Sequence, residues 1–177
     1  FNRQEQLSYR IIFCEIVSTL SIQKIGGSFV CKIFDMYTDI SQSFIYLLYL
    51  HYNEVFITKP NTSRSANSEK YIVCRGFKGI DPTLLKKLYI IVKNFNFIYE
   101  KNMFINKIFD YKDEEFTKNL NLINTKLFNL QIHTIDRTLD IIKNKKYDDT
   151  FNENTYNQTS LAFRWCKYYK VSINYNS

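Results

Sequence analysis

Apolar residues recur at helical spacing in the first part of the chain. Between residues 3 and 25, the apolar residues Leu7, Ile11, Ile16 and Leu20 recur at helical spacing. This spacing predicts an amphipathic helix. The pair Gly26–Gly27 follows, and it is expected to end the helix because glycine adopts positive φ at little cost.

A mostly apolar run follows over residues 28–34, and it contains one cation, Lys32. A continuous apolar run of this length predicts a strand buried on both faces, as in a parallel sheet. Burying an ammonium group costs several kcal/mol unless a partner compensates its charge. Because such conflicts are common at functional sites, we predict that Lys32 is buried and functional. From the residues alone, an ion-paired or snorkelling structural lysine is an equal alternative.

The pattern then repeats. Asp39 and Gln42 form a plausible capping pair for a helix over 40–52, and residues 54–58 read as a second short strand. The order helix, strand, helix, strand predicts two parallel strands joined by a right-handed crossover.

A third strand is predicted over residues 70–74, after a polar loop at 59–68. The loop is too short and too polar for the crossover that a parallel strand requires, so the third strand should run antiparallel to the second. This topology places the carboxyl end of the first strand, near Lys32, at the same edge of the sheet as Glu69. Ligands bind at that edge in open α/β sheets, so we expect Lys32, Glu69 and the loop to converge on one site.

The rest of the chain reads as helical. The predicted helices are one capped by Asp81 with Pro82 in its first turn, one over about 114–145, and one around 161–166 after a polar break at 148–153. They are expected to pack on the strands rather than to form a second active domain. The predicted fold class is therefore α/β, with two parallel strands, one antiparallel strand and a helical C-terminal extension, divided into residues 1–79 and 80–177.

The charge distribution points to a polyanionic partner. The formal net charge of the 177 residues is +7, and residues 59–93 hold eight cations against two acids. Concentrated positive charge is typical of nucleic-acid binding. On charge alone, a solvated basic surface explains the pattern equally well.

The remaining composition narrows the class of protein. The four cysteines have no C-x-x-C spacing and read as reduced core residues of an intracellular protein. Two histidines, far apart, do not suggest a metal site, and no apolar run reaches the ~18 residues of a membrane span. The chain begins with Phe1 rather than methionine, so we expect its true N-terminus to lie elsewhere.

Three linked motifs closely resemble those of the FtsJ-like (RrmJ-type) ribose 2′-O-methyltransferases. They are Gly26-Gly27-Ser28-Phe29-Val30-Cys31-Lys32, then Lys59-Pro60-(x)2-Ser63-Arg64, then Ser68-Glu69-Lys70-Tyr71. The resemblance covers about residues 3–77. It implies a Rossmann-like, doubly wound sheet with one antiparallel strand near its edge, and it implies S-adenosylmethionine as the cofactor.

The resemblance also implies roles for individual residues. The family's catalytic set is Lys-Asp-Lys-Glu, and its last two members fall on Lys32 and Glu69. The first two members and the Gly-rich cofactor loop lie upstream in the family, so the cofactor-binding residues are expected upstream of Phe1. Lys32 is expected to act as the base or to orient the ribose hydroxyl, and Glu69 to hold lysine and ribose in register.

The implied substrate is RNA. Expected RNA contacts are Lys59, Ser63, Arg64, Ser68 and Tyr71. Asp35 after Lys-Ile-Phe, and the segment 161–169, look more like the cap-methylating branch of eukaryotes and large DNA viruses. Capped mRNA is therefore the expected substrate, with ribosomal and transfer RNA as alternatives. The protein is expected in the cytoplasm or nucleus or, if it is viral, in the virion or viral factory.

Two other functions remain open. One is a non-catalytic RNA-binding or stimulatory module, a relic of a methyltransferase that keeps the basic face. The other is a different Rossmann-like enzyme, in which the buried lysine and the Ser-Arg loop would be coincidences.

Overall fold

The computed structural model describes residues 4–60, 63–100, 108, 113–144 and 147–173. Its elements in chain order are α1 (Gln4–Ile22), β1 (Phe29–Ile33), α2 (Asp39–His51), β2 (Tyr52–Thr58), β3 (Lys70–Phe77), α3 (Pro82–Glu100), α4 (Glu114–Asn144) and α5 (Tyr147–Tyr169). The chain divides into two compact units, one of residues 1–59 and 68–126 and the other of residues 60–67 and 127–177.

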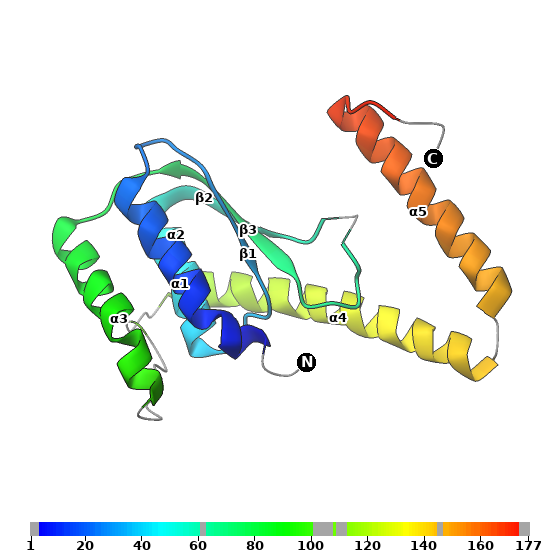
Figure 1. The fold of residues 1–177 in the computed structure, drawn as a ribbon, viewed down its shortest axis with the longest axis horizontal. Coiled ribbons are helices and arrows are strands. Elements are labelled where there is room, and N and C mark those ends of the chain that lie inside the picture. Colours follow the sequence, from blue (N-terminus) through cyan, green and yellow to red (C-terminus); the bar gives the residue numbers. More distant parts are fainter. Residues whose placement is uncertain (1–3, 61–62, 101–107, 109–112, 145–146, 174–177) are drawn as a thin grey trace. The chain divides into compact units, whose positions relative to one another are not determined.

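The three strands of the first unit form one sheet in the order β1-β3-β2 (Figure 1). Both outer strands pair antiparallel with β3. The antiparallel pairing of the second and third strands is therefore confirmed, but the predicted parallel pair is wrong. Among the described residues, no two strands pair in parallel. The physical reason is that β3 occupies the position between the two strands that the helical crossover was expected to bring together.

The prediction that the first strand is buried on both faces is also wrong. Burial alternates along β1, with Cys31 and Ile33 buried and Val30 and Lys32 exposed. Successive side chains of a strand point to opposite faces, and α1 packs against β1. The face that carries Cys31 is therefore covered, whereas the face that carries Lys32 is open.

The core of this unit forms where α1 and α2 meet the covered face of the sheet. Phe13 of α1 is fully buried and stacks on Phe44 of α2, with 5.4 Å between the ring centroids. On the sheet, Ile72 and Cys74 are fully buried. The predicted helix is present, but of the four apolar residues on which it was based Ile16 and Leu20 are buried whereas Leu7 and Ile11 are exposed.

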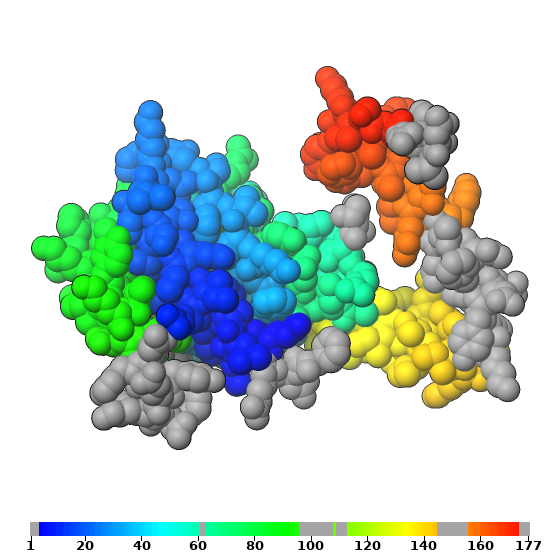
Figure 2. Space-filling view, in the orientation of Figure 1, coloured from blue at the N-terminus to red at the C-terminus, as the bar shows by residue number. Residues whose placement is uncertain are grey.

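α3 packs along α1, as the adjoining green and blue surfaces show (Figure 2). Tyr89 donates a hydrogen bond to the Ser21 hydroxyl at 2.8 Å. α3 begins as predicted, because the Asp81 carboxylate accepts hydrogen bonds from the backbone N–H groups of Thr83 and Leu84. The N-terminal part of α4, as far as Lys126, also belongs to this unit, and Phe116 packs on Tyr46 at 5.0 Å between ring centroids.

Local signals placed most helix ends, with two corrections. Gly26 has φ +82° and follows the end of α1, as predicted. The N-cap of α2 is Thr38 rather than Asp39, and its side chain accepts from the Ser41 N–H. The polar break predicted at 148–153 is wrong, because these residues lie within α5. The segment contains neither glycine nor proline, the two residues that disfavour a helix most strongly.

Of the second unit, the structure describes the loop residues Ser63–Asn67, the C-terminal part of α4, and α5. Gln131 of α4 donates a hydrogen bond to the backbone carbonyl of Ala66 at 3.0 Å. In α5, Trp165 packs on Tyr169 with 4.9 Å between ring centroids. Among the described residues, no helix is long and apolar enough to cross a membrane.

Candidate active site

Lys32 and Glu69 meet at one edge of the sheet. The Lys32 ammonium lies 3.0 Å from a Glu69 carboxylate oxygen. Lys32 comes from the carboxyl end of β1 and Glu69 from the residue before β3, and the antiparallel register of β1 and β3 brings these two ends together. The predicted convergence of the two side chains is therefore present.

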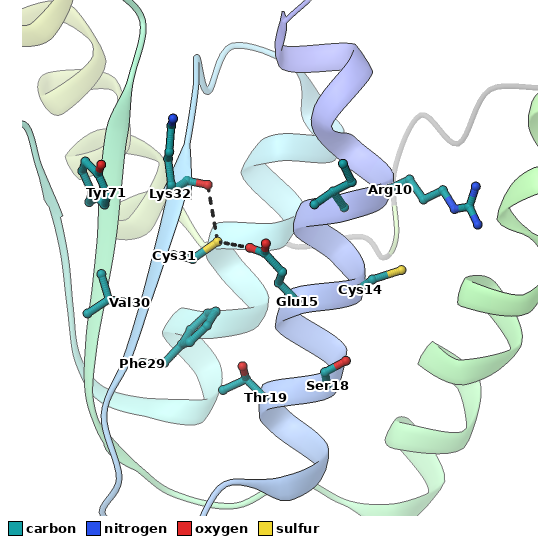
Figure 3. Close-up of a pocket in the computed structure, with 11 residues that line it drawn as sticks. Arg10, Cys14, Glu15, Ser18, Thr19, Phe29, Val30, Cys31, Lys32 and Tyr71 are labelled. Carbon is teal, nitrogen blue, oxygen red and sulfur yellow. Dashed lines mark hydrogen bonds between the residues drawn. The ribbon is translucent and has the colours of Figure 1, made fainter. Parts of the chain in front are cut away.

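Lys32 is not buried, which corrects the premise from which its role was first inferred. Half of its side-chain surface is exposed, compared with a quarter for Glu69. Its ammonium lies 5.6 Å from the centre of the Phe34 ring. Figure 3 shows the Lys32 side chain pointing away from Glu15 and Cys31, whose side chains lie on the covered side of β1. The alternation of the strand, rather than its apolar composition, decides this exposure.

The ion pair shifts the pKa values of both partners in the direction that keeps them charged. The hydrogen bond to Glu69 and the charge of that carboxylate raise the pKa of Lys32. The hydrogen bond from Lys32 lowers the pKa of Glu69. A cationic Lys32 beside an anionic Glu69 is therefore the state of this pair at neutral pH.

Tyr71 and Lys59 complete the surroundings of Glu69. The Tyr71 hydroxyl donates to the Glu69 carboxylate at 3.1 Å, and Tyr71 is the register partner of Lys32 across the two strands. The Lys59 ammonium donates to the backbone carbonyl of Glu69 at 2.8 Å. Burial, followed by the charge of Lys70, lowers the pKa of Lys59. Both residues were predicted to contact RNA, and both also hold Glu69.

The sequence reasoning missed Lys70, which is the buried lysine of this site. Its side chain is 5% exposed, and its ammonium lies 2.7 Å from Asp35 Oδ1 and 3.0 Å from the Ser68 carbonyl oxygen. The alternation of the third strand contained the signal, because Lys70 shares a face with the buried residues Ile72 and Cys74.

The remaining predicted RNA contacts fall in two places. Ser68 is 9% exposed and its hydroxyl donates to the Gln4 side chain at 3.0 Å, so it is already engaged inside the first unit. Ser63 and Arg64 belong to the second unit. The Ser63 Oγ is buried with no hydrogen-bond partner among the described groups, and Arg64 is exposed. Their role in RNA binding stays a prediction.

A hollow of about 860 Å³ lies between α1 and β1 (Figure 3). Its lining holds one carboxylate, Glu15, and that group already accepts a hydrogen bond from the Cys31 thiol at 3.1 Å. S-Adenosylmethionine offers an amino group and ribose hydroxyls that need acceptors, so this lining does not fit the cofactor. Among the described residues, no cluster of three or more His, Cys, Asp and Glu side chains could hold a metal ion.

Comparison with known proteins agrees with the motifs. Residues 2–77 match the model of the FtsJ-like methyltransferase family. This segment is FtsJ-like. The resemblance inferred from the three linked motifs is therefore confirmed.

The FtsJ-like segment is also similar to curated proteins. Over 81 residues the chain is 51% identical to a mouse protein and 49% identical to a human protein, each named cap-specific mRNA (nucleoside-2′-O-)-methyltransferase 1. Over 91 residues it is 43% identical to methyltransferase 1A of the same description from Caenorhabditis briggsae. These alignments cover 45–49% of this chain, and the chain spans about a tenth of the length of these relatives.

Proposed function

We propose that this chain contributes the acceptor side of an RNA ribose 2′-O-methyltransferase active site, and that the RNA is capped mRNA. The ion pair between Lys32 and Glu69 at the end of the sheet carries the proposal. Support for a methyltransferase comes from the FtsJ-like segment, and support for a capped substrate comes from the names of its relatives.

Lys32 is assigned to the ribose 2′-hydroxyl. A half-exposed ammonium at the edge of a sheet is accessible to an RNA sugar while Glu69 holds it from one side. The hydroxyl has to give up its proton, here to solvent water, as its oxygen attacks the methyl group, and a fixed cation close to that oxygen stabilises the negative charge left by the departing proton. Lys32 therefore orients the hydroxyl and stabilises the developing charge.

The raised pKa of Lys32 favours this orienting role over the role of base. Even at an ordinary lysine pKa near 10.4, fewer than about one molecule in a thousand carries a neutral amine at neutral pH. Burial was expected to lower the pKa, but Lys32 is half exposed. To accept the proton, Lys32 would first have to give up one of its own, which its contact with Glu69 disfavours.

Glu69 is assigned to hold Lys32 in place. Its carboxylate accepts from the Lys32 ammonium and from the Tyr71 hydroxyl, which fixes the carboxylate from two directions. Lys59, Ser63 and Arg64 are proposed to contact the RNA backbone, as cations and hydroxyls do in RNA-binding proteins. Tyr71 is proposed to pack on the sugar or a base.

S-Adenosylmethionine is proposed as the methyl donor, because the FtsJ-like family is a methyltransferase family. When bound, it supplies the methyl group that the activated hydroxyl receives. The hollow between α1 and β1 does not fit it, so no residue here is assigned to it.

The test is a methyl-transfer assay with the complete protein on capped RNA whose first nucleotides carry free 2′-hydroxyls. Lys32→Ala should lower kcat by about a hundredfold or more, because it removes the group that positions the acceptor. Lys118→Ala is the matched control, since Lys118 is an exposed lysine of α4 in the same unit and lies outside the basic segment 59–93. It should transfer methyl groups at the wild-type rate.

Normal turnover by Lys32→Ala would overturn the assignment of Lys32. RNA binding by the wild-type protein without any methyl transfer would instead support the non-catalytic RNA-binding module. RNA that is already 2′-O-methylated on its first nucleotides should accept no label, and uncapped RNA should be a poorer substrate than capped RNA of the same sequence.

A further inference from the structure

Glu69 lies outside the hydrogen-bond ladder that orders its neighbours. β3 begins at Lys70, and the register between β1 and β3 ends at the pair Ile33–Lys70. The strand pairing therefore does not by itself fix the backbone of Ser68 and Glu69. Something else has to place the Glu69 carboxylate within reach of Lys32.

Two lysine ammonium groups hold this short segment by its carbonyl groups. Lys70 donates to the Ser68 carbonyl at 3.0 Å, and Lys59 donates to the Glu69 carbonyl at 2.8 Å. Consecutive carbonyl groups are thus fixed from two different elements. Hydrogen bonds from charged donors are about twice as strong as neutral ones.

Lys70 can do this only because Asp35 compensates its charge. The Lys70 side chain is 5% exposed, and its ammonium lies 2.7 Å from Asp35 Oδ1. The Asp35 side chain is 30% exposed. Asp35 follows Lys32 by three residues, just after β1 ends at Ile33. The pair therefore joins the segment that carries Lys32 to the segment that carries Glu69.

We propose that the ion pair between Asp35 and Lys70 is a positioning device: it holds the Ser68–Glu69 backbone so that the Glu69 carboxylate stays against Lys32. Asp35 and Lys70 are positioning residues and touch no reacting atom. The effect on catalysis rests on the proposed function, whereas the effect on the contact between Lys32 and Glu69 does not.

A purely structural role makes a different prediction. A buried ion pair often contributes little net stability, and replacing both partners by uncharged side chains is frequently neutral, whereas removing one partner leaves a costly buried charge. If the pair served stability alone, a folded variant without either charge would leave Lys32 and Glu69 unchanged. If it positions Glu69, the same folded variant would loosen their contact.

The experiment uses the double variant Asp35→Asn/Lys70→Met in the full chain, with Asp35→Asn alone as a second variant. The probe is the titration of the Lys32 side chain, followed by NMR in lysine-labelled protein, with the signal assigned from its loss in Lys32→Arg. Circular dichroism and the thermal midpoint establish that each variant is folded.

In the folded variants the pKa of Lys32 should fall towards its ordinary value of about 10.4, because Glu69 no longer stays against it. Glu54→Gln is the matched control. It removes the pair between Arg75 and Glu54, which joins β2 and β3 in the same sheet at 3.3 Å, and it should leave the titration of Lys32 unchanged.

Methyl transfer by the complete protein gives a second measurement. Loss of positioning should lower kcat on the order of tenfold to a hundredfold, while KM for RNA changes by less than about twofold. A folded double variant with the wild-type Lys32 titration would overturn the positioning proposal. The two proposals can also fail separately. If the variants show a lowered Lys32 pKa but the wild-type protein transfers no methyl group, the positioning proposal is supported and the proposed function is overturned.

Discussion

Lys32 and Lys70 lie on opposite faces of the same sheet, at the same edge. Lys32 is opposite Tyr71 in the register and Lys70 is opposite Ile33, so the two lysines are one step apart along the paired strands. Half of the Lys32 side chain is exposed, whereas 5% of the Lys70 side chain is. Lys32 is therefore accessible to a substrate, whereas Lys70 is enclosed and paired with Asp35.

The first prediction concerns the charge of Lys32. Glu69→Gln should lower the pKa of Lys32 towards its ordinary value, because the hydrogen bond and the negative charge of Glu69 are what raise it. NMR titration of labelled lysine side chains measures the shift. Tyr71→Phe should leave most of the shift in place, because it removes only a hydrogen bond to Glu69. An unchanged Lys32 pKa in Glu69→Gln would contradict the ion pair in solution.

The same pair sets a pH window. The pKa of Glu69 is lowered in the folded protein, so its contribution to stability is present above its unfolded value of about 4.3 and is lost as the pH falls through the folded value. The pKa of Lys32 is raised, so its contribution is complete below about 10.4 and is lost as the pH rises through the folded value. A double-mutant cycle with Lys32→Ala and Glu69→Gln should show coupling at about pH 7 and none at about pH 2.

The second prediction concerns the core between α1 and α2. Phe13→Ala should lower the free energy of unfolding by about 3–5 kcal/mol, because Phe13 is fully buried and stacks on Phe44. Phe13→Leu, which keeps more of the volume, should cost clearly less. Urea unfolding followed by circular dichroism measures both. Equal and small losses in the two variants would show that Phe13 is not enclosed.

The third prediction compares two glycines at positive φ. Gly26→Ala should cost about 1–2 kcal/mol from backbone strain alone, because Gly26 has φ +82° and a Cβ there would meet no atom within 4 Å. Gly76→Ala should cost more, since Gly76 has φ +71° and its Cβ would lie 2.6 Å from the Asn53 side-chain nitrogen.

The background Asn53→Ala separates strain from collision at Gly76. In that background the cost of Gly76→Ala should fall towards that of Gly26→Ala, because the colliding amide is gone. Urea unfolding of the wild type, Gly26→Ala, Gly76→Ala, Asn53→Ala and Asn53→Ala/Gly76→Ala gives the comparison. A cost at Gly76 that does not depend on Asn53 would assign the whole effect to backbone strain.

The fourth prediction concerns the thiols. Burial raises the pKa of Cys74 to about 12, and burial together with the hydrogen bond to Glu15 raises the pKa of Cys31. At pH 8 the reactive thiolate of a group with a pKa of 12 amounts to about one molecule in ten thousand. Cys31 and Cys74 should therefore react with a thiol reagent such as DTNB only on unfolding.

Cys14 and Cys166 provide the internal comparison, because both are only half-buried. They should react in the native protein, and Cys14→Ser/Cys166→Ser should remove the fast phase while leaving the slow one. Four thiols that react at one rate in the native state would contradict the burial of Cys31 and Cys74.

The sequence by itself determined the local turn and cap signals and the motifs that supply the residues of the candidate site. The glycine turn that follows α1, the aspartate that caps α3 and the antiparallel return into β3 follow from turn and cap residues that act within a few positions. The FtsJ-like motifs, which include Lys32 and Glu69, can also be recognised from the sequence. That these two side chains meet at one edge followed from strand direction alone.

Only the tertiary structure decided the pairing of the strands and the burial of each lysine. Composition cannot show that β3 lies between β1 and β2, because that order depends on which strand edges meet. Nor can an apolar run show which of its alternate positions faces α1. The register placed Lys32 on the open face and Lys70 on the covered face, and a shift of one residue in either strand would have moved the lysine of that strand to the other face.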